Sequence, residues 1–261
     1  MESDPRQWIQ TLRQSHDRLA GIVAKLSPEQ VSGPSYCSEW STAQVLSHLG
    51  SGAEIGLGNL EASLAHREAP SRDTYTEIWD RWNAKTPDQM AADFVESDRR
   101  YVTRLEGLSD AELASVSAQM MGRTLDATAI VGMRLYEHAL HTWDVEVVRD
   151  PKATVQPQAV DLMIDLLPGR AGRLARGDKP KAAPVELHVD TEAPARSCSL
   201  KIGEEVSLDA DGGSPDGRLT LPSEALLRLT YGRLDPEHTP SDVKVEGPVS
   251  LDELRTLFGG F

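Results

Sequence analysis

Apolar residues in the first half of the chain recur every three or four positions, which is the spacing of one face of an α-helix. Proline in a first turn, and serine or threonine just before one, are common signals for a helix start. Together these features predict four long helices, which begin at Asp4-Pro5, at Ser41 or Thr42, at Thr86-Pro87 and near Ala127. Four helices joined by modest connections indicate an antiparallel bundle, whose interior can hold a site built from facing side chains.

The pattern changes after Asp150-Pro151, because the residue before a proline is pushed out of the helical conformation. One amphipathic helix is expected around 160–167, and alternating apolar and polar residues over 185–208 then predict strands separated by turns. Two further helices begin at Ser223 and Ser250. We therefore expect an α+β two-domain chain. The expected domains are a helical bundle over residues 1–150 and a smaller α+β domain over residues 151–261.

The composition excludes several classes of partner. A net charge of −14 disfavours nucleic acid and anionic lipid, because phosphate contacts need clustered lysine and arginine. No apolar run approaches the roughly 20 residues of a membrane-spanning helix. The N-terminal sequence lacks the basic and apolar segments of a secretory signal, so we expect a cytoplasmic protein. Cys37 and Cys198 show no metal-binding spacing and are interpreted as reduced and incidental; the alternative is a reactive thiol at Cys37.

The helix after Ala127 carries a polar stripe among apolar neighbours. Its members follow one another at intervals of three or four residues and therefore share one side of the helix: Arg134, Glu137, His141 and Asp144. Apolar residues flank the stripe on both sides, which indicates that it faces the bundle interior. Because buried charges are costly unless they are paired or bound to a metal, the stripe needs a partner.

A metal ion is one partner that suits this stripe. Glu137 and His141 lie one turn apart, so a carboxylate and an imidazole can close on the same cation. His48 is the best candidate for a third ligand, because it sits in the middle of another helix among apolar residues. Two histidines and one carboxylate leave a coordination position open, as in catalytic zinc sites, and Fe(II) or Ni(II) would accept similar ligands. Asp144 is expected to orient His141 rather than to bind the metal.

Other interpretations of the same residues stay open. The stripe can be a solvated ladder of ion pairs among Arg134, Glu137 and Asp144, and His48 can be a hydrogen-bonded core histidine. His138 could replace a ligand in principle, although it points about 100° away from Glu137 around the helix. The other histidines show no partner pattern and are interpreted as surface or packing residues: His16, His66, His188 and His238.

At these residues the chain resembles a known family, the DinB-like mycothiol-dependent enzymes typified by maleylpyruvate isomerase. The resemblance rests on motifs in both halves of the chain, which follow one another in the family's order. These motifs are Trp40-Ser41-Thr42 with His48 eight residues after the tryptophan, Gly122-Arg123-Thr124, Glu137-His138-Ala139-Leu140-His141-Thr142-Trp143-Asp144 and Leu229-Thr230-Tyr231-Gly232-Arg233.

The resemblance implies a DinB-like four-helix bundle followed by a sterol carrier protein-like α+β domain. His48, Glu137 and His141 match the family's three zinc ligands. Arg233 matches an arginine that the family brings from its C-terminal domain to the active site. Mycothiol is the thiol cosubstrate that the resemblance implies.

The predicted function is therefore a metal-dependent thiol S-transferase or isomerase that uses mycothiol on a small electrophilic, carboxylated substrate. Metal coordination holds a thiol as thiolate, which can add to a conjugated double bond. Arg233 can bind the substrate carboxylate, and Arg233 and Asp144 are the predicted catalytic residues. The alternatives are a zinc-dependent hydrolase of a small molecule, with Asp144 as base, and a noncatalytic small-molecule carrier with a structural metal.

Overall fold

The computed structural model describes residues 4–120, 123–210 and 213–260, and Gly122 of the second family motif lies outside them. The chain divides into two compact units, Met1–Thr154 and Val155–Phe261. The first unit is mainly helical, whereas the second combines helices with a five-stranded sheet. The predicted α+β fold class is therefore confirmed.

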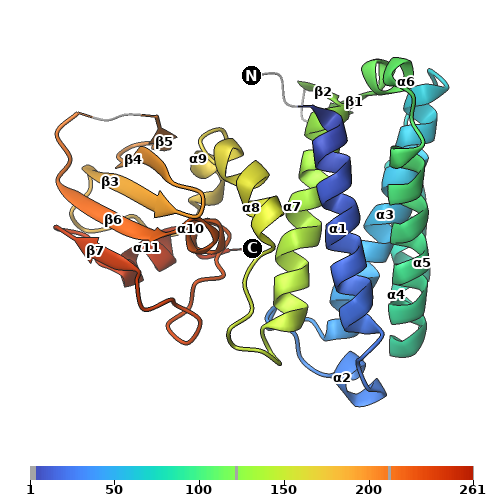
Figure 1. Cartoon of the computed structure of the whole chain (residues 1–261), viewed down its shortest axis with the longest axis horizontal. Coiled ribbons are helices and arrows are strands. Elements are labelled where there is room, and N and C mark those ends of the chain that lie inside the picture. Colours follow the sequence, from blue (N-terminus) through green and yellow to red (C-terminus); the bar gives the residue numbers. More distant parts are fainter. Residues whose placement is uncertain (1–3, 121–122, 211–212, 261) are drawn as a thin grey trace. The chain divides into compact units, whose positions relative to one another are not determined.

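Four long helices form a bundle in the first unit (Figure 1). Both α1 and α3 contact α5 and α7, so each helix has two main neighbours. The bounds of the long helices are Pro5–Val23 (α1), Thr42–Leu64 (α3), Pro87–Glu106 (α5) and Ala127–Glu146 (α7). The shorter elements of this unit are α2 (Pro28–Ser32), α4 (Arg72–Asn83), α6 (Asp110–Ser115), β1 (Ser117–Met120) and β2 (Arg123–Asp126).

The long helices start where the sequence predicts. The side chain of Asp4 accepts a hydrogen bond from a backbone N–H in the first turn of α1. Ser41 and Thr86 cap α3 and α5 in the same way, and the side-chain oxygen of the glutamine three residues after each accepts a hydrogen bond from the backbone N–H of the cap residue. Each cap satisfies a backbone N–H that the helix itself leaves without a partner.

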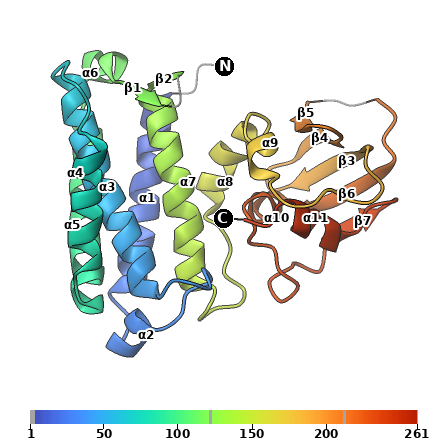
Figure 2. The ribbon, with the colours of Figure 1, turned by 180° about the vertical axis from the view of Figure 1, so that it is seen from behind.

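The helices are not arranged in the simple antiparallel order that the sequence predicts. Two contacts between α3 and α5 follow the same order along both helices: Ser97 with Gly50, and Arg104 with Glu61. These two neighbours therefore run parallel, as Figures 1 and 2 show. The reason is α4, which was not predicted and which carries the chain back along α3, so that α5 starts again from the same end of the bundle.

Trp82 anchors the otherwise exposed helix α4 to the bundle. Its side chain is 2% exposed, and its Nε1 donates a hydrogen bond of 2.8 Å to Glu54 on α3. The indole fits because Gly50 has no side chain, since a Cβ there would lie 2.3 Å from the ring. Apolar residues of several helices surround this contact, including Leu46, Leu49, Phe94 and Val145.

The second unit contains a mixed sheet in the strand order β5-β4-β3-β6-β7. β3 and β6 run parallel and the other pairs are antiparallel. The strands are β3 (Val185–Glu192), β4 (Arg196–Ile202), β5 (Val206–Asp209), β6 (Gly217–Pro222) and β7 (Lys244–Glu246). The helices are α8 (Pro157–Met163), the 3₁₀ turn η1 (Ile164–Leu166), α9 (Ala171–Leu174), α10 (Ser223–Thr230) and α11 (Leu251–Leu257).

Burial along β3 explains why this strand was predictable. Val185, Leu187 and Val189 are buried, whereas the residues between them are only partly covered. Helix α10 contacts β3 and β6. Strands β6 and β7 were not predicted.

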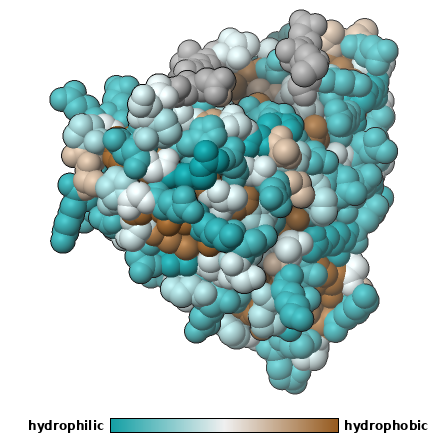
Figure 3. Space-filling model, turned by 60° about the vertical axis from the view of Figure 1, so that its left-hand side comes forward, coloured by the Kyte–Doolittle hydropathy of each residue, from teal (hydrophilic) through white to brown (hydrophobic). Residues whose placement is uncertain are grey.

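The surface agrees with the acidic composition. On the face drawn in Figure 3, hydrophilic residues predominate and hydrophobic residues form small separate areas. Among the described helices, none is both long and apolar enough to cross a membrane.

Candidate metal centre

The predicted polar stripe is present on α7, and its members have partners on other helices as well as within the stripe. Arg134 donates a 2.6 Å hydrogen bond to Asp98 on α5. Glu137 lies 3.1 Å from His48 on α3, and Asp144 is fully buried. The alternative of a solvated ladder of ion pairs is therefore wrong, because two of the three side chains it requires are buried and each has another partner.

The three predicted ligands, His48, Glu137 and His141, lie together. Nε2 of His48 is 3.1 Å and Nε2 of His141 is 3.6 Å from the same oxygen, Oε2 of Glu137. One donor atom from each side chain lies within 4.8 Å of the other two. The side chain of Glu137 is 55% exposed, so the cluster is open to solvent on that side. Converging nitrogen and oxygen donors with one accessible side suit a divalent cation with an exchangeable position.

Asp144 holds the other ring nitrogen of His141. Its Oδ2 lies 2.8 Å from Nδ1 of His141, and the thiol of Cys37 donates to the same oxygen at 3.2 Å. This contact leaves Nε2 of His141 directed at Glu137. Asp144 thus lies where a residue that orients the imidazole is expected, behind the ring and not among the three donors.

The electrostatics of the cluster favour a charged carboxylate. Burial alone would raise the pKa of Glu137, but hydrogen bonds from His141 and His48 outweigh it and hold the pKa well below its ordinary value. Burial alone would lower the pKa of His141, but hydrogen bonds with Asp144, Cys37 and Glu137 raise the pKa to about 10. A metal ion that binds here must therefore displace a proton from His141.

A second polar cluster, centred on Asp98, was missed by the sequence analysis. Asp98 is fully buried and receives three contacts: Arg134 Nη2 at 2.6 Å, His16 Nδ1 at 2.7 Å and His138 Nε2 at 3.1 Å. His16, which shows no partner pattern in the sequence and was interpreted as a surface or packing residue, is buried in the core with Asp98 as its partner. The usable signal is the position of Asp98 on the apolar face of α5, four residues after Phe94 and three before Tyr101.

The Asp98 cluster has the electrostatics of a structural ion pair rather than of a metal site. Burial alone would raise the pKa of Asp98, but His138 and Arg134 outweigh it and hold the pKa well below its ordinary value. Burial lowers the pKa of His138, against the opposing effect of Asp98. A divalent cation would be placed beside the guanidinium that already neutralises the carboxylate. His138 therefore belongs to the bundle core and does not replace a ligand.

Trp40 lies against both imidazoles of the first cluster. Its ring centroid is 5.2 Å from that of His48 and 6.1 Å from that of His141, and the side chain is 37% exposed. The backbone on either side is fixed, because Ser35 Oγ donates to the Trp40 carbonyl at 2.7 Å and Trp40 N–H donates to the Cys37 carbonyl at 2.8 Å. The periodicity of the sequence could not place Trp40 at the site, because it lies in the loop before α3.

Arg233 follows α10 in the second unit. It is half-buried, and its guanidinium donates to the carbonyl of Tyr231 at 2.9 Å. Gly232, just before it, has a φ of +70°, a conformation that favours glycine. The neighbouring Arg228 is 2% exposed and forms a 2.7 Å ion pair with Glu224, so it is part of the core of this unit. The role of Arg233 at the metal centre stays a prediction.

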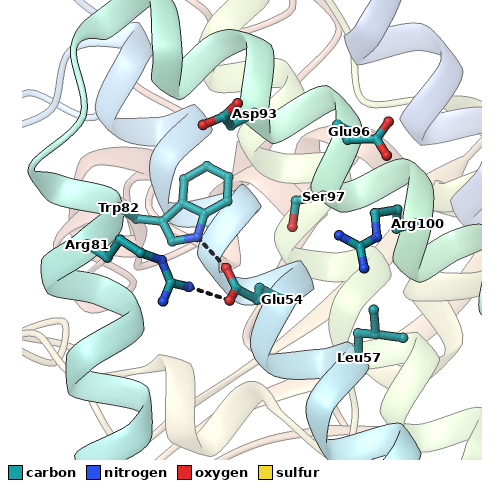
Figure 4. A pocket seen from close by; sticks show the side chains of 8 residues that line it. All are labelled: Glu54, Leu57, Arg81, Trp82, Asp93, Glu96, Ser97 and Arg100. Carbon is teal, nitrogen blue, oxygen red and sulfur yellow. Dashed lines mark hydrogen bonds and ion pairs between the residues drawn. The ribbon is translucent and has the colours of Figure 1, made fainter.

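A pocket of about 400 Å³ lies elsewhere in the first unit, among α3, α4 and α5 (Figure 4). Its walls are formed by Glu54, Leu57, Arg81, Trp82, Asp93, Glu96, Ser97 and Arg100, which do not include a predicted ligand. Three ion pairs engage its carboxylates: Glu54 with Arg81, Asp93 with Lys85, and Glu96 with Arg99. The lining of this pocket is therefore mostly charged.

Comparison with known families gives one match in the first unit. Residues 12–146, just over half of the chain, match the family described as mycothiol maleylpyruvate isomerase N-terminal domain. This segment contains the three predicted ligands and Asp144. No curated protein matches the chain.

Solved structures resemble both units. Two crystal structures of the mycothiol-dependent maleylpyruvate isomerase, one of them a mutant, match with a TM-score of 0.66 and 13% sequence identity, over 94% of this chain and 93% of that chain. The resemblance shows a shared two-domain fold. YfiT from Bacillus subtilis, described as a probable metal-dependent hydrolase with an unusual four-helix bundle topology, matches 56% of this chain and 85% of its own, with 18% identity and a TM-score of 0.43.

Proposed function

Because the chain belongs to the mycothiol maleylpyruvate isomerase N-terminal domain family, we propose that it is a metal-dependent enzyme that uses mycothiol as a thiol cosubstrate. The proposed reaction is transfer of the thiol to a small electrophilic, carboxylated substrate, or isomerisation of that substrate through thiol addition. The proposed metal is zinc, with Fe or Ni as alternatives, and its proposed ligands are His48, Glu137 and His141.

The observation that carries this proposal is that three donor side chains from two helices converge in one cluster, which is open to solvent at Glu137. The donor atoms of His48, Glu137 and His141 lie within 4.8 Å of one another, although α3 and α7 are far apart in sequence. A set of two imidazoles and one carboxylate fits a zinc ion that keeps a position for an exchangeable ligand. When bound, such a metal supplies the Lewis acidity that keeps a coordinated thiol deprotonated near neutral pH.

The residues of the chain have distinct roles in this scheme. Asp144 accepts a hydrogen bond from Nδ1–H of His141 and so keeps Nε2 directed at Glu137. The exposed side of Glu137 leaves room for a thiol and an electrophile to approach from solvent. In this scheme Asp144 acts by orienting an imidazole, so it is a positioning residue and not a proton-transferring one.

We assign the substrate carboxylate to Arg233. A guanidinium can bind a carboxylate through two parallel hydrogen bonds, and its charge would also stabilise an enolate that forms when a thiolate adds to a conjugated carbonyl compound. Arg233 is half-buried and has a fixed backbone, so it suits a binding role better than the fully engaged Arg228.

Thiol chemistry fits the site better than water activation with Asp144 as the base. A general base must come within hydrogen-bonding distance of the water that it deprotonates. Asp144 is fully buried, and one of its oxygens already receives His141 and Cys37. This arrangement argues against the role that the hydrolase alternative gives to Asp144.

The experiment that tests the proposal measures the products formed from maleylpyruvate in the presence of mycothiol. Zinc-reconstituted protein is incubated with mycothiol and maleylpyruvate, and both the isomerised product and the thiol adduct are quantified by liquid chromatography. We expect turnover that stops on chelation, returns when zinc is restored, and is lost in His48→Ala. Turnover that is equal with and without mycothiol, or that survives complete removal of metal, would contradict the proposal.

A further inference from the structure

The indole ring of Trp40 packs beside the candidate metal centre. It contacts the imidazoles of His48 and His141 on one side, with ring centroids 5.2 and 6.1 Å away. The planes of Trp40 and His141 are inclined by only 29°. Since the residue is 37% exposed, the protein does not cover it fully, and a molecule that approaches the cluster can contact it.

Trp40 is partly exposed, although the polar groups beside it are buried. His141, which Trp40 contacts, is 8% exposed, and Asp144 behind it is fully buried. Trp79 on α4 is exposed to a similar degree, 42%, but its ring lies against Tyr75 and away from any of the proposed ligands.

We propose that Trp40 determines substrate specificity at the metal centre, by stacking on a flat ring or conjugated group of the molecule that binds there. This inference rests on the proposed function, because it assumes that a thiol reaches the metal held by His48, Glu137 and His141. The adjacency of the indole to two of these ligands places a π surface next to the cluster. Aromatic faces recognise such groups through offset stacking and edge contacts.

The test compares two simple thiols that share a metal-binding sulfur and differ in their flat surface. Ethanethiol and benzyl mercaptan are titrated into protein loaded with Co(II), and the thiolate absorption band of the metal reports binding. We expect benzyl mercaptan to bind more tightly than ethanethiol in the wild type by about 2- to 10-fold beyond their difference in hydrophobic area. In Trp40→Ala this excess should disappear while the affinity for ethanethiol stays unchanged.

Two variants separate specificity from structure. Trp40→Phe retains a flat ring and should keep most of the excess, and Trp79→Ala removes an equally exposed tryptophan and should keep all of it. An unchanged ratio of the two affinities in Trp40→Ala overturns the inference and leaves the proposed function intact. Loss of Co(II) itself from Trp40→Ala also overturns it, because the indole would then act on the ligands. Failure of both thiols to bind the wild-type metal overturns the proposed function, and this inference with it.

Discussion

His141 joins the parts of the candidate centre, because each of its ring nitrogens has a partner. Nδ1 lies 2.8 Å from Asp144, and Nε2 lies 3.6 Å from Glu137. The contact with Asp144 fixes the orientation of the ring, since the carboxylate is fully buried on the same helix. A histidine held in this way presents one defined nitrogen to a metal.

Replacing Asp144 with alanine should weaken metal binding without abolishing it. We expect the zinc affinity of Asp144→Ala to fall by about 10- to 100-fold, because His141 loses its orienting partner while the three donors remain. Competition with a chromophoric chelator measures the affinity. Asp190→Ala is the matched control, since Asp190 forms a similar aspartate–histidine pair in the second unit, 3.1 Å from His188. The zinc affinity of Asp190→Ala should equal that of the wild type. Equal affinities for all three proteins would contradict the orienting role.

Residues with local spacing could be predicted from helix geometry, and His48 from its place among apolar residues of another helix. The i, i+4 relation of Glu137 and His141, and the i, i+3 relation of His141 and Asp144, follow from helix geometry alone. Local spacing could not predict that Asp98 is the partner of His16, because Asp98 lies on another helix 82 residues away. Local spacing could not place Trp40 either, because a loop has no regular period.

At the scale of the elements, the Asp98 cluster connects all four long helices. His16 comes from α1, Asp98 from α5, and Arg134 from α7, whose guanidinium also donates to the carbonyl of Leu49 on α3 at 2.8 Å. Glu137 and His141 lie one and two turns beyond Arg134 on the same helix. The cluster therefore fixes the helix that carries two of the proposed ligands.

Removing the charge of Asp98 should destabilise the bundle. We expect Asp98→Asn to lower the free energy of unfolding by about 3–5 kcal/mol, because the buried Arg134 loses its counter-charge. Urea denaturation of wild type and variant measures the difference. Asp93→Asn on the same helix is the control, since Asp93 forms an exposed ion pair with Lys85 and should change stability by less than about 1 kcal/mol.

The same comparison has a defined pH dependence. Because the pKa of Asp98 is lowered in the folded state, its stabilising effect is present above the ordinary aspartate pKa and is lost as the pH falls through the folded value. The stability difference between wild type and Asp98→Asn should be full at neutral pH and should shrink below about pH 4. A difference that stays constant down to pH 2 would contradict this assignment of charge.

The elements that could be predicted are those with a strong apolar period or a clear cap. Helix α4 lacked such a signal because only Trp82 of its residues is buried, so its sequence is polar on almost every side. Missing α4 led to the wrong order of helix directions, since four helices without a return segment alternate up and down. Strand β7 is only three residues long, which is too short for an alternation to be recognised.

At the scale of the whole molecule, the proposed residue roles are divided between the two units. The three proposed ligands belong to the first unit, and Arg233 belongs to the second. Both units share the fold of the mycothiol-dependent maleylpyruvate isomerase over nearly the full chain. Metal binding and substrate binding should therefore be separable by mutation.

Replacing Arg233 with alanine should affect turnover and leave the metal in place. We expect kcat/KM for a carboxylated electrophile to fall on the order of 10- to 100-fold, the effect of losing a charged hydrogen bond, while zinc content stays at the wild-type level. Steady-state kinetics and elemental analysis of the same preparation measure both quantities. Arg218→Ala on β6, an exposed arginine paired with Asp190, should change neither. If Arg233→Ala has the kinetics of the wild type, Arg233 does not bind the substrate.

The most direct test of the account is the metal content of three purified proteins, namely wild type, His141→Ala and His188→Ala, after mild chelation, reconstitution with zinc and desalting. His188 is half-exposed on β3 and controls for the loss of a histidine as such. We expect about one equivalent of zinc in the wild type and in His188→Ala and little in His141→Ala, because a site with two protein ligands binds zinc weakly. Equal zinc in all three proteins, or none in the wild type, would contradict a metal centre built from His48, Glu137 and His141.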